Sequence, residues 1–175
     1  ELVGGENIVG KNCQLGAQPT GITCKVQEVN KLSFINNQVY PDGRENLVLD
    51  ACNNCVIEGN NFKSYYNGIL VLNGNDNTVN KNIFWLTGAV QNQLLDHGDD
   101  FGIINVKGNN NMVASNSLSC EWAYAGAVTV NAVQGTGNVF KNCFVDNLES
   151  YRVFLVNAQT EVSNCVSSDK VSIVE

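Results

Sequence analysis

A short pattern returns along the whole chain: an apolar residue, two variable residues, an asparagine, one variable residue and a second apolar residue. Val79, Asn82 and Phe84 form one copy. Neighbouring copies lie 22 to 26 residues apart, except for one interval of 34 residues. Seven copies fill the chain, with their asparagines at Asn12, Asn37, Asn60, Asn82, Asn116, Asn142 and Asn164. A strand, a helix and a return strand need about 30 residues or more. The repeat length therefore indicates one coil of a solenoid.

A second apolar run in each repeat has the length and composition of a short buried strand. Gly68–Leu72 and Gly102–Val106 are two examples, rich in Val, Ile and Leu and flanked by Gly, Asn or Asp. Two or three such strands per coil, stacked on similar neighbours, predict an all-β parallel β-helix of about seven coils.

The repeated asparagines acquire a physical role in such a stack. Asn at a tight corner tolerates a left-handed backbone, and its amide can bond to the amide of the next coil. Such bonds satisfy polar groups that are buried between coils. We therefore predict an asparagine ladder in which Asn82 and Asn116 point inward and stack on adjacent coils.

Composition limits the function classes. With 175 residues and 43% hydrophobic residues, the chain can form one domain, residues 1–175, with a core spread along an axis. A net charge of -7 and a pI near 4.6 exclude a basic nucleic-acid surface and disfavour anionic polysaccharides. No apolar run approaches the roughly 20 residues of a membrane span. Motifs for phosphate, dinucleotide, zinc-protease or serine-hydrolase sites are absent, so we expect no cofactor.

The seven cysteines are expected to be free thiols. Cys13, Cys143 and Cys165 each directly follow a repeat asparagine, which places them in one column of the stack, where a thiol behaves as a small buried hydrophobe. Cys52 and Cys55 are the only close pair, and a zinc site there would need two further ligands that a single histidine can hardly supply. We therefore predict no structural metal.

The ends of the sequence and its longer insertions suggest how the coils are used. The chain starts and stops inside a coil with no capping helix, which favours a fragment of a longer β-helix over an end covered by a partner. Segments follow the asparagine-containing strands at equivalent places, and we expect them to line one binding side of the solenoid: Lys63–Tyr66, Trp85–Phe101, Ser119–Ala125 and Asp146–Arg152.

The longest of these segments concentrates charge. It holds Asp96, Asp99, Asp100 and His97, the only histidine of the chain. The neighbouring segments contribute aromatic and polar side chains at Tyr65, Tyr66, Glu121, Trp122, Tyr124 and Arg152. Acids flanked by flat rings suit a sugar site, because apolar sugar faces stack on rings while paired carboxylates act on the anomeric centre. The alternative is a solvated acidic turn or a calcium-like oxygen cluster.

Specific roles can be assigned within this hypothesis. Asp100 is the first candidate catalytic carboxylate because it lies next to a predicted strand, and Glu121, one coil later, is the second. At most one of the adjacent Asp99 and Asp100 can face the same ligand as Asp96. His97 would orient a hydroxyl or an acid. Sugar contacts are expected from Tyr65, Tyr66, Asp99, Trp122, Tyr124 and Arg152, whereas Trp85 and Phe101 are expected to pack against the barrel wall.

The repeats resemble those of pectate-lyase-like right-handed β-helix proteins over nearly the whole chain. Within that superfamily, Phe62–Gly74 and Leu95–Gly108 resemble inulin fructotransferases, which cut a difructose dianhydride from the end of inulin. The resemblance implies an intramolecular transfer: one acid protonates the leaving oxygen while a second carboxylate helps a hydroxyl of the same difructose unit attack. It also implies a secreted bacterial homotrimer with sites between neighbouring β-helices. This chain is far shorter than those enzymes.

Two functional hypotheses follow. The first is a carbohydrate-active enzyme of the fructotransferase, polysaccharide lyase or glycosidase type, acting on a neutral fructan such as inulin. The second is a non-catalytic trimeric module of the tailspike or fibre type that binds glycan or acts as a stiff spacer. Neither involves nucleic acid or a membrane.

Overall fold

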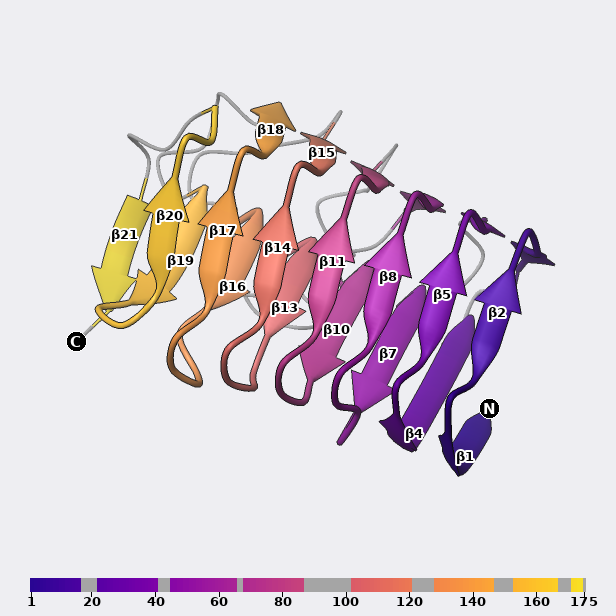
Figure 1. Ribbon diagram of the computed structural model, residues 1–175. Coiled ribbons are helices and arrows are strands. Elements are labelled where there is room, and N and C mark those ends of the chain that lie inside the picture. The colour runs from indigo at the N-terminus through magenta and orange to yellow at the C-terminus, as the bar shows by residue number, and fades with distance from the viewer. Residues whose placement is uncertain are drawn as a thin grey trace.

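The computed structural model describes residues 1–16, 22–40, 45–65, 68–86, 102–120, 128–146, 153–166 and 171–174. Within these ranges the regular structure consists of short strands in three parallel sheets (Figure 1). None of the described residues forms a helix that is long and apolar enough to cross a membrane.

Each coil contributes one strand to each sheet, and the sheets are named A, B and C in the order in which a coil visits them. Sheet A contains β1 (Leu2–Glu6), β4 (Cys24–Asn30), β7 (Leu47–Asp50), β10 (Leu70–Asn73), β13 (Ile104–Val106), β16 (Val130–Ala132), β19 (Phe154–Asn157) and β21 (Val171–Val174). Sheet B contains β2 (Val9–Lys11), β5 (Ser33–Ile35), β8 (Val56–Glu58), β11 (Thr78–Asn80), β14 (Met112–Ala114), β17 (Val139–Lys141) and β20 (Glu161–Ser163). Sheet C contains β3 (Gln14–Leu15), β6 (Gln38–Val39), β9 (Asn61–Ser64), β12 (Ile83–Leu86), β15 (Ser117–Cys120) and β18 (Phe144–Asp146).

This strand order makes the chain a parallel β-helix, as the repeat predicted. Every strand pairs in parallel with the strand one coil earlier or later, and the coils advance along one axis from β1 to β21 (Figure 1). The described strands form six coils of three strands, a seventh of two strands (β19 and β20), and β21.

The corner between sheets B and C is two residues long in every described coil. Its first residue has a left-handed backbone, with φ between 51° and 66°, at Asn12, Asn36, Gly59, Lys81, Ser115, Asn142 and Asn164. By the strand register, its second residues form one column: Cys13, Asn37, Asn60, Asn82, Asn116, Cys143 and Cys165. We call this column the B–C ladder.

Asparagine amides join successive coils in this ladder. The backbone N and the side-chain Nδ2 of Asn60 both donate to Oδ1 of Asn82, each at 2.9 Å. Asn82 makes the same two bonds to Oδ1 of Asn116, at 2.9 and 3.0 Å. All four ladder asparagines are buried. The predicted inward stacking of Asn82 on Asn116 is confirmed.

The predicted asparagine positions are wrong by one residue at the two ends of the ladder. Asn12, Asn142 and Asn164 occupy the left-handed corner position, and the following cysteines Cys13, Cys143 and Cys165 take the ladder position. Asn suits both positions, because it tolerates a left-handed backbone and also carries an amide that can bond across coils. The pattern alone did not distinguish these two roles.

A second ladder, which the sequence analysis did not predict, lies at the corner between sheets A and B. Nδ2 of Asn77 donates to Oδ1 of Asn111 at 3.0 Å, and Nδ2 of Asn111 donates to Oδ1 of Asn138 at 3.1 Å. The backbone N of Cys55 donates to Oδ1 of Asn77 at 2.8 Å. This ladder keeps buried amides paired at the second corner of the coil.

Apolar columns fill the space between the three sheets. Phe62 and Phe84, on β9 and β12, are fully buried with ring centroids 5.0 Å apart and planes 1° apart. Phe34 lies 6.3 Å from Phe62 in the same interior. All seven cysteines are free thiols, as predicted, and four of them are buried. The core is therefore a set of one-residue columns rather than a single centre.

Candidate functional site

Three neighbouring strands of sheet C, β9, β12 and β15, end at stacked positions, and there the chain leaves for the next strand of sheet A. Leu86, the last residue of β12, pairs with Ser64 at the end of β9 and with Cys120 at the end of β15. The longer segments therefore leave the β-helix from one sector, as the sequence analysis predicted.

Most of the predicted site residues lie outside the described residues. These are Asp96, His97, Asp99 and Asp100 in 87–101, Glu121, Trp122 and Tyr124 in 121–127, Tyr66 in 66–67, and Arg152 in 147–152. All of these segments connect sheet C to sheet A. Their positions and roles stay predictions. Tyr65 is described: it directly follows β9 and is 43% exposed.

Strand bounds add one constraint on the two predicted carboxylates. Glu121 directly follows Cys120, the end of β15 in sheet C, whereas Asp100 precedes β13 of sheet A, which begins at Ile104. Glu121 therefore belongs to the start of one connection and Asp100 to the end of the connection one coil earlier.

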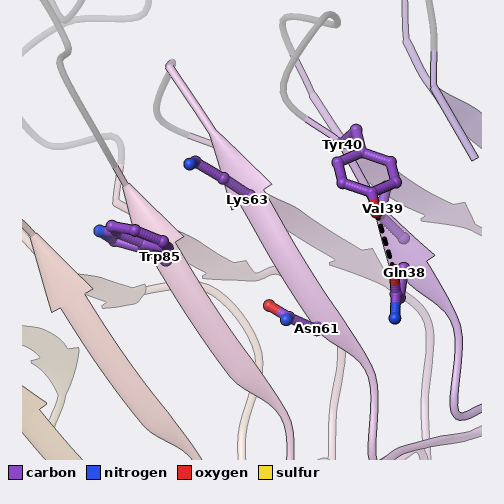
Figure 2. A pocket seen from close by; sticks show the side chains of 6 residues that line it. All are labelled: Gln38, Val39, Tyr40, Asn61, Lys63 and Trp85. Atoms are coloured by element: carbon purple, nitrogen blue, oxygen red, sulfur yellow. Dashed lines mark hydrogen bonds between the residues drawn. The ribbon is translucent and has the colours of Figure 1, made fainter.

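Beside this sector, the outer face of sheet C has a shallow pocket of about 90 Å³. Figure 2 shows its six lining side chains, which come from three neighbouring coils: Gln38, Val39, Tyr40, Asn61, Lys63 and Trp85. We call this pocket the sheet C groove.

The alternation of side chains along each strand explains why these residues face outward. Phe62 and Phe84 point into the core, so Lys63 and Trp85, the next residues, point to the opposite face. Trp85 pairs with Lys63 across β12 and β9. Tyr40 follows Val39, the partner of Phe62, and so lies in line with Lys63 one coil earlier. Tyr40, Lys63 and Trp85 thus form one outward row along the axis.

Contacts within the row combine aromatic and cationic groups. Nζ of Lys63 lies 4.2 Å from the centroid of the Trp85 ring, a cation–π contact. The Tyr40 hydroxyl donates to Oε1 of Gln38 at 2.8 Å, and the Tyr40 side chain is 43% exposed. Nδ2 of the buried Asn46 donates to the backbone O of Lys63 at 2.7 Å, which fixes the end of β9 under the groove.

Tyr40 was not predicted as a site residue, and Lys63 was predicted only as the start of a segment on the binding side. Trp85, which it expected to pack against the barrel wall, lies half-buried on the outer face and lines the groove. The sequence does carry a signal for this row of residues. In each sheet C strand, the residue after the buried Phe or Val faces outward, because side chains alternate along a strand.

Metal-ligating groups do not gather in the part of the chain that the structure describes: no three His, Cys, Asp or Glu side chains form a cluster there. What the groove offers chemically is therefore flat ring surface, one ammonium group, two amides and one phenol. This set can stack on an apolar face and exchange hydrogen bonds with hydroxyl groups.

A family model for the right handed beta helix region matches residues 20–173, which is most of the chain. The chain belongs to the right-handed β-helix family. Its parallel coils are therefore right-handed, in agreement with the resemblance seen in the sequence. No sequence among the curated proteins matches the chain.

Solved structures of a β-helix enzyme, DFA-IIIase from Arthrobacter chlorophenolicus A6, superpose well on this family member. The structure without its lid has a TM-score of 0.81 at 21% identity and covers 97% of this chain and 45% of that chain. The complex with GF2 gives 0.78 at 22% identity, with 97% and 46% covered. The complex with DFA-III gives 0.76 at 21% identity, with 97% and 48% covered. This chain thus spans less than half of DFA-IIIase, and the likeness shows a shared fold.

Proposed function

We propose that this β-helix protein is carbohydrate-active and that the sheet C groove holds sugar rings beside the loops that carry the chemistry. The observation that supports this most directly is the row of Tyr40, Lys63 and Trp85 on the outer face, next to the sector from which the loops leave. The Trp85 and Tyr40 rings supply faces for stacking, and Lys63 and Asn61 supply donors for sugar hydroxyls.

The proposed ligand is a neutral fructan such as inulin. The net charge of -7 disfavours an anionic polymer. DFA-IIIase, which has the same fold, has been crystallised with GF2 and with DFA-III, and the Phe62–Gly74 and Leu95–Gly108 segments resemble inulin fructotransferases. These observations favour a fructan over other glycans.

The proposed reaction is an intramolecular fructosyl transfer by acids of the connecting segments. One carboxyl group protonates the leaving glycosidic oxygen, and a second carboxylate takes the proton of a fructosyl hydroxyl as that oxygen attacks the anomeric carbon. We assign these roles to Asp100 and Glu121, with Asp96 as the alternative acid and His97 as the group that orients a hydroxyl. The reaction consumes no water, because the attacking oxygen comes from the substrate.

The assembly proposed with this function is a secreted bacterial homotrimer, with sites between neighbouring β-helices. The exposed side of sheet C would then face a second copy across the groove. The alternative, a non-catalytic trimeric module that binds glycan, uses the same groove but leaves the ligand unchanged.

Binding is tested by titrating inulin oligomers into the protein in a calorimeter. Trp85→Ala should weaken binding about tenfold, which corresponds to roughly 1.4 kcal/mol of lost stacking. Ile83→Ala is the matched control: it lies on the same strand and face, is 50% exposed and does not line the groove, so affinity should not change. Equal affinities for the Trp85 and Ile83 variants would remove the groove from the proposal.

Catalysis is tested by incubating the protein with inulin and reading the products by mass. Asp100→Asn and Glu121→Gln should each lower turnover about 100-fold or more while inulin binding persists. Release of a difructose dianhydride by the wild type supports the transfer. Bound but intact inulin supports the non-catalytic module instead, and full activity in both amide variants would move the chemistry to other residues.

A further inference from the structure

Two cysteines occupy adjacent positions of the B–C ladder, one coil apart. The register of β17 and β20 pairs Lys141 with Ser163 and thereby places Cys143 beside Cys165. Backbone hydrogen bonds hold this register on both sides: N of Asn142 donates to O of Ser163 at 3.1 Å, and N of Val166 donates to O of Cys143 at 3.0 Å. Strands in register lie about 4.8 Å apart. That spacing falls within the range of about 4.4 to 6.8 Å between Cα atoms joined by a disulfide.

The thiol of Cys165 also contacts the backbone of Cys143 directly. The backbone N of Cys143 donates to Sγ of Cys165 at 3.4 Å, in the place where an asparagine oxygen accepts elsewhere in the ladder. Cys143 is 2% exposed and Cys165 is 6% exposed. Each Sγ also lies 3.5 Å from a backbone carbonyl of its own coil. Both side chains are therefore confined to the interior and aimed at the same space.

We propose that Cys143 and Cys165 form a reversible disulfide that ties two successive coils of the β-helix together. A bond at this position would replace weak hydrogen bonds to sulfur with a covalent link in the column where the ladder lacks amides. The stapled region comprises β17, β18, β19 and β20. Its free thiol form is the one that the structure shows.

Hydrogen bonding around Cys143 favours the exchange chemistry. A hydrogen bond from the Cys165 thiol, together with donors of Asn116, lowers the pKa of Cys143 from its ordinary value of 9.0 to about 7. The pKa of Cys165 is raised, chiefly by the hydrogen bond that its thiol makes to Cys143. The contact between the two thiols therefore favours the thiolate of Cys143 over that of Cys165.

The oxidant is a low-molecular-weight disulfide such as oxidised glutathione. Because both thiols are buried, exchange takes place when the coil that carries Cys165 opens locally. A thiolate of the pair then attacks one sulfur of this disulfide and releases one glutathione thiolate, which leaves a mixed disulfide on the protein. The second cysteine, after loss of its proton to solvent, attacks the protein sulfur and releases the other glutathione. Two protein S–H bonds are lost, one S–S bond forms, and oxidised glutathione is reduced to two thiols.

Trypsin gives an unambiguous readout, because Arg152 lies between the two cysteines. After cleavage at lysine and arginine, Cys143 lies in peptide 142–152 and Cys165 in peptide 153–170. The folded protein is incubated with oxidised glutathione at neutral pH, remaining thiols are alkylated, and the digest is read by mass. The expected product is peptide 142–152 joined by a disulfide to peptide 153–170. It should form in most chains and disappear on reduction.

Two variants serve as matched controls. Cys143→Ser keeps a hydrogen-bonding atom in the ladder and should abolish the linked peptides. Cys52→Ser removes a thiol of the other close pair, whose members Cys52 and Cys55 share peptide 45–63, and should leave the linked peptides unchanged.

The stability readout is independent of the peptide map. Oxidised wild-type protein should melt about 4 °C or more above the reduced protein, and Cys143→Ser should show no such difference. In the wild-type protein itself, stable glutathione adducts without the cross-link would overturn the proposal. Unmodified thiols at both positions in the folded protein would also overturn it. A cross-link that lowers the melting temperature would also overturn it.

Discussion

Replacing Asn82 with alanine removes four hydrogen bonds from the middle of the B–C ladder. Its Oδ1 accepts from the backbone N and from Nδ2 of Asn60, both at 2.9 Å. Its Nδ2 donates to O of Ile57 at 2.9 Å and to Oδ1 of Asn116 at 3.0 Å. The side chain is 1% exposed, so neither neighbour can turn to bulk water.

The magnitude follows from the groups that lose a partner. Oδ1 of Asn116 keeps the backbone N of residue 82 as a donor, whereas Asn60 loses the acceptor of both its backbone N–H and one Nδ2 hydrogen. An unpaired buried donor costs about 1 to 3 kcal/mol. With two such donors and a space large enough for one water, we expect a loss of about 3 kcal/mol.

Urea unfolding followed by circular dichroism measures this loss as a lower midpoint. The matched control is Asn80→Ala: Asn80 lies two residues earlier on the outer face of β11, and its Oδ1 has no hydrogen-bond partner. This Oδ1 is buried without a partner, so its removal should not lower stability. If the two variants unfold at the same urea concentration, amide stacking does not hold the coils together and the ladder argument fails.

Three further predictions concern the core, the corners and the close contacts between coils. Phe62→Ala should cost about 3 to 5 kcal/mol in the same urea assay, because it empties the centre of a ring stack, whereas Phe144→Ala on the exposed face should cost less than about 0.5 kcal/mol. Gly108→Ala should destabilise the fold by at least about 1 to 3 kcal/mol, or prevent folding, because a Cβ there would overlap the backbone carbonyl of Gly74 in the preceding coil. Wild-type stability of this variant would refute the contact. Ser115→Gly should raise the thermal midpoint, because Ser115 holds φ at 55° in the corner position that Gly59 fills in another coil at 66°; a lower midpoint would show that the left-handed backbone is not strained.

Part of the site could be predicted because stacking fixes angular position. A repeat places equivalent residues in one sector, so the common departure point of the long segments at Ser64, Leu86 and Cys120 follows from the period alone. The groove itself could not be predicted in this way. Tyr40, Lys63 and Trp85 each stand three residues after a repeat asparagine, so the period places them in one row. Because their side chains are unlike one another, only the tertiary structure shows that they line one pocket.

The sequence by itself determined the solenoid class, the coil length, the inward stacking of Asn82 on Asn116 and the placement of Cys13, Cys143 and Cys165 in one column of the stack. These properties follow from a period of one coil, which requires each buried group to match the same group in the next coil. Only the tertiary structure decided which of two neighbouring corner residues points inward. Cys13 rather than Asn12, and Cys143 rather than Asn142, takes the ladder position. The tertiary structure also showed that a second ladder forms at the corner between sheets A and B, and which residues line the groove. The physical reason is that these choices depend on hydrogen bonds and side-chain contacts between coils, and those contacts exist only once the coils have stacked in register.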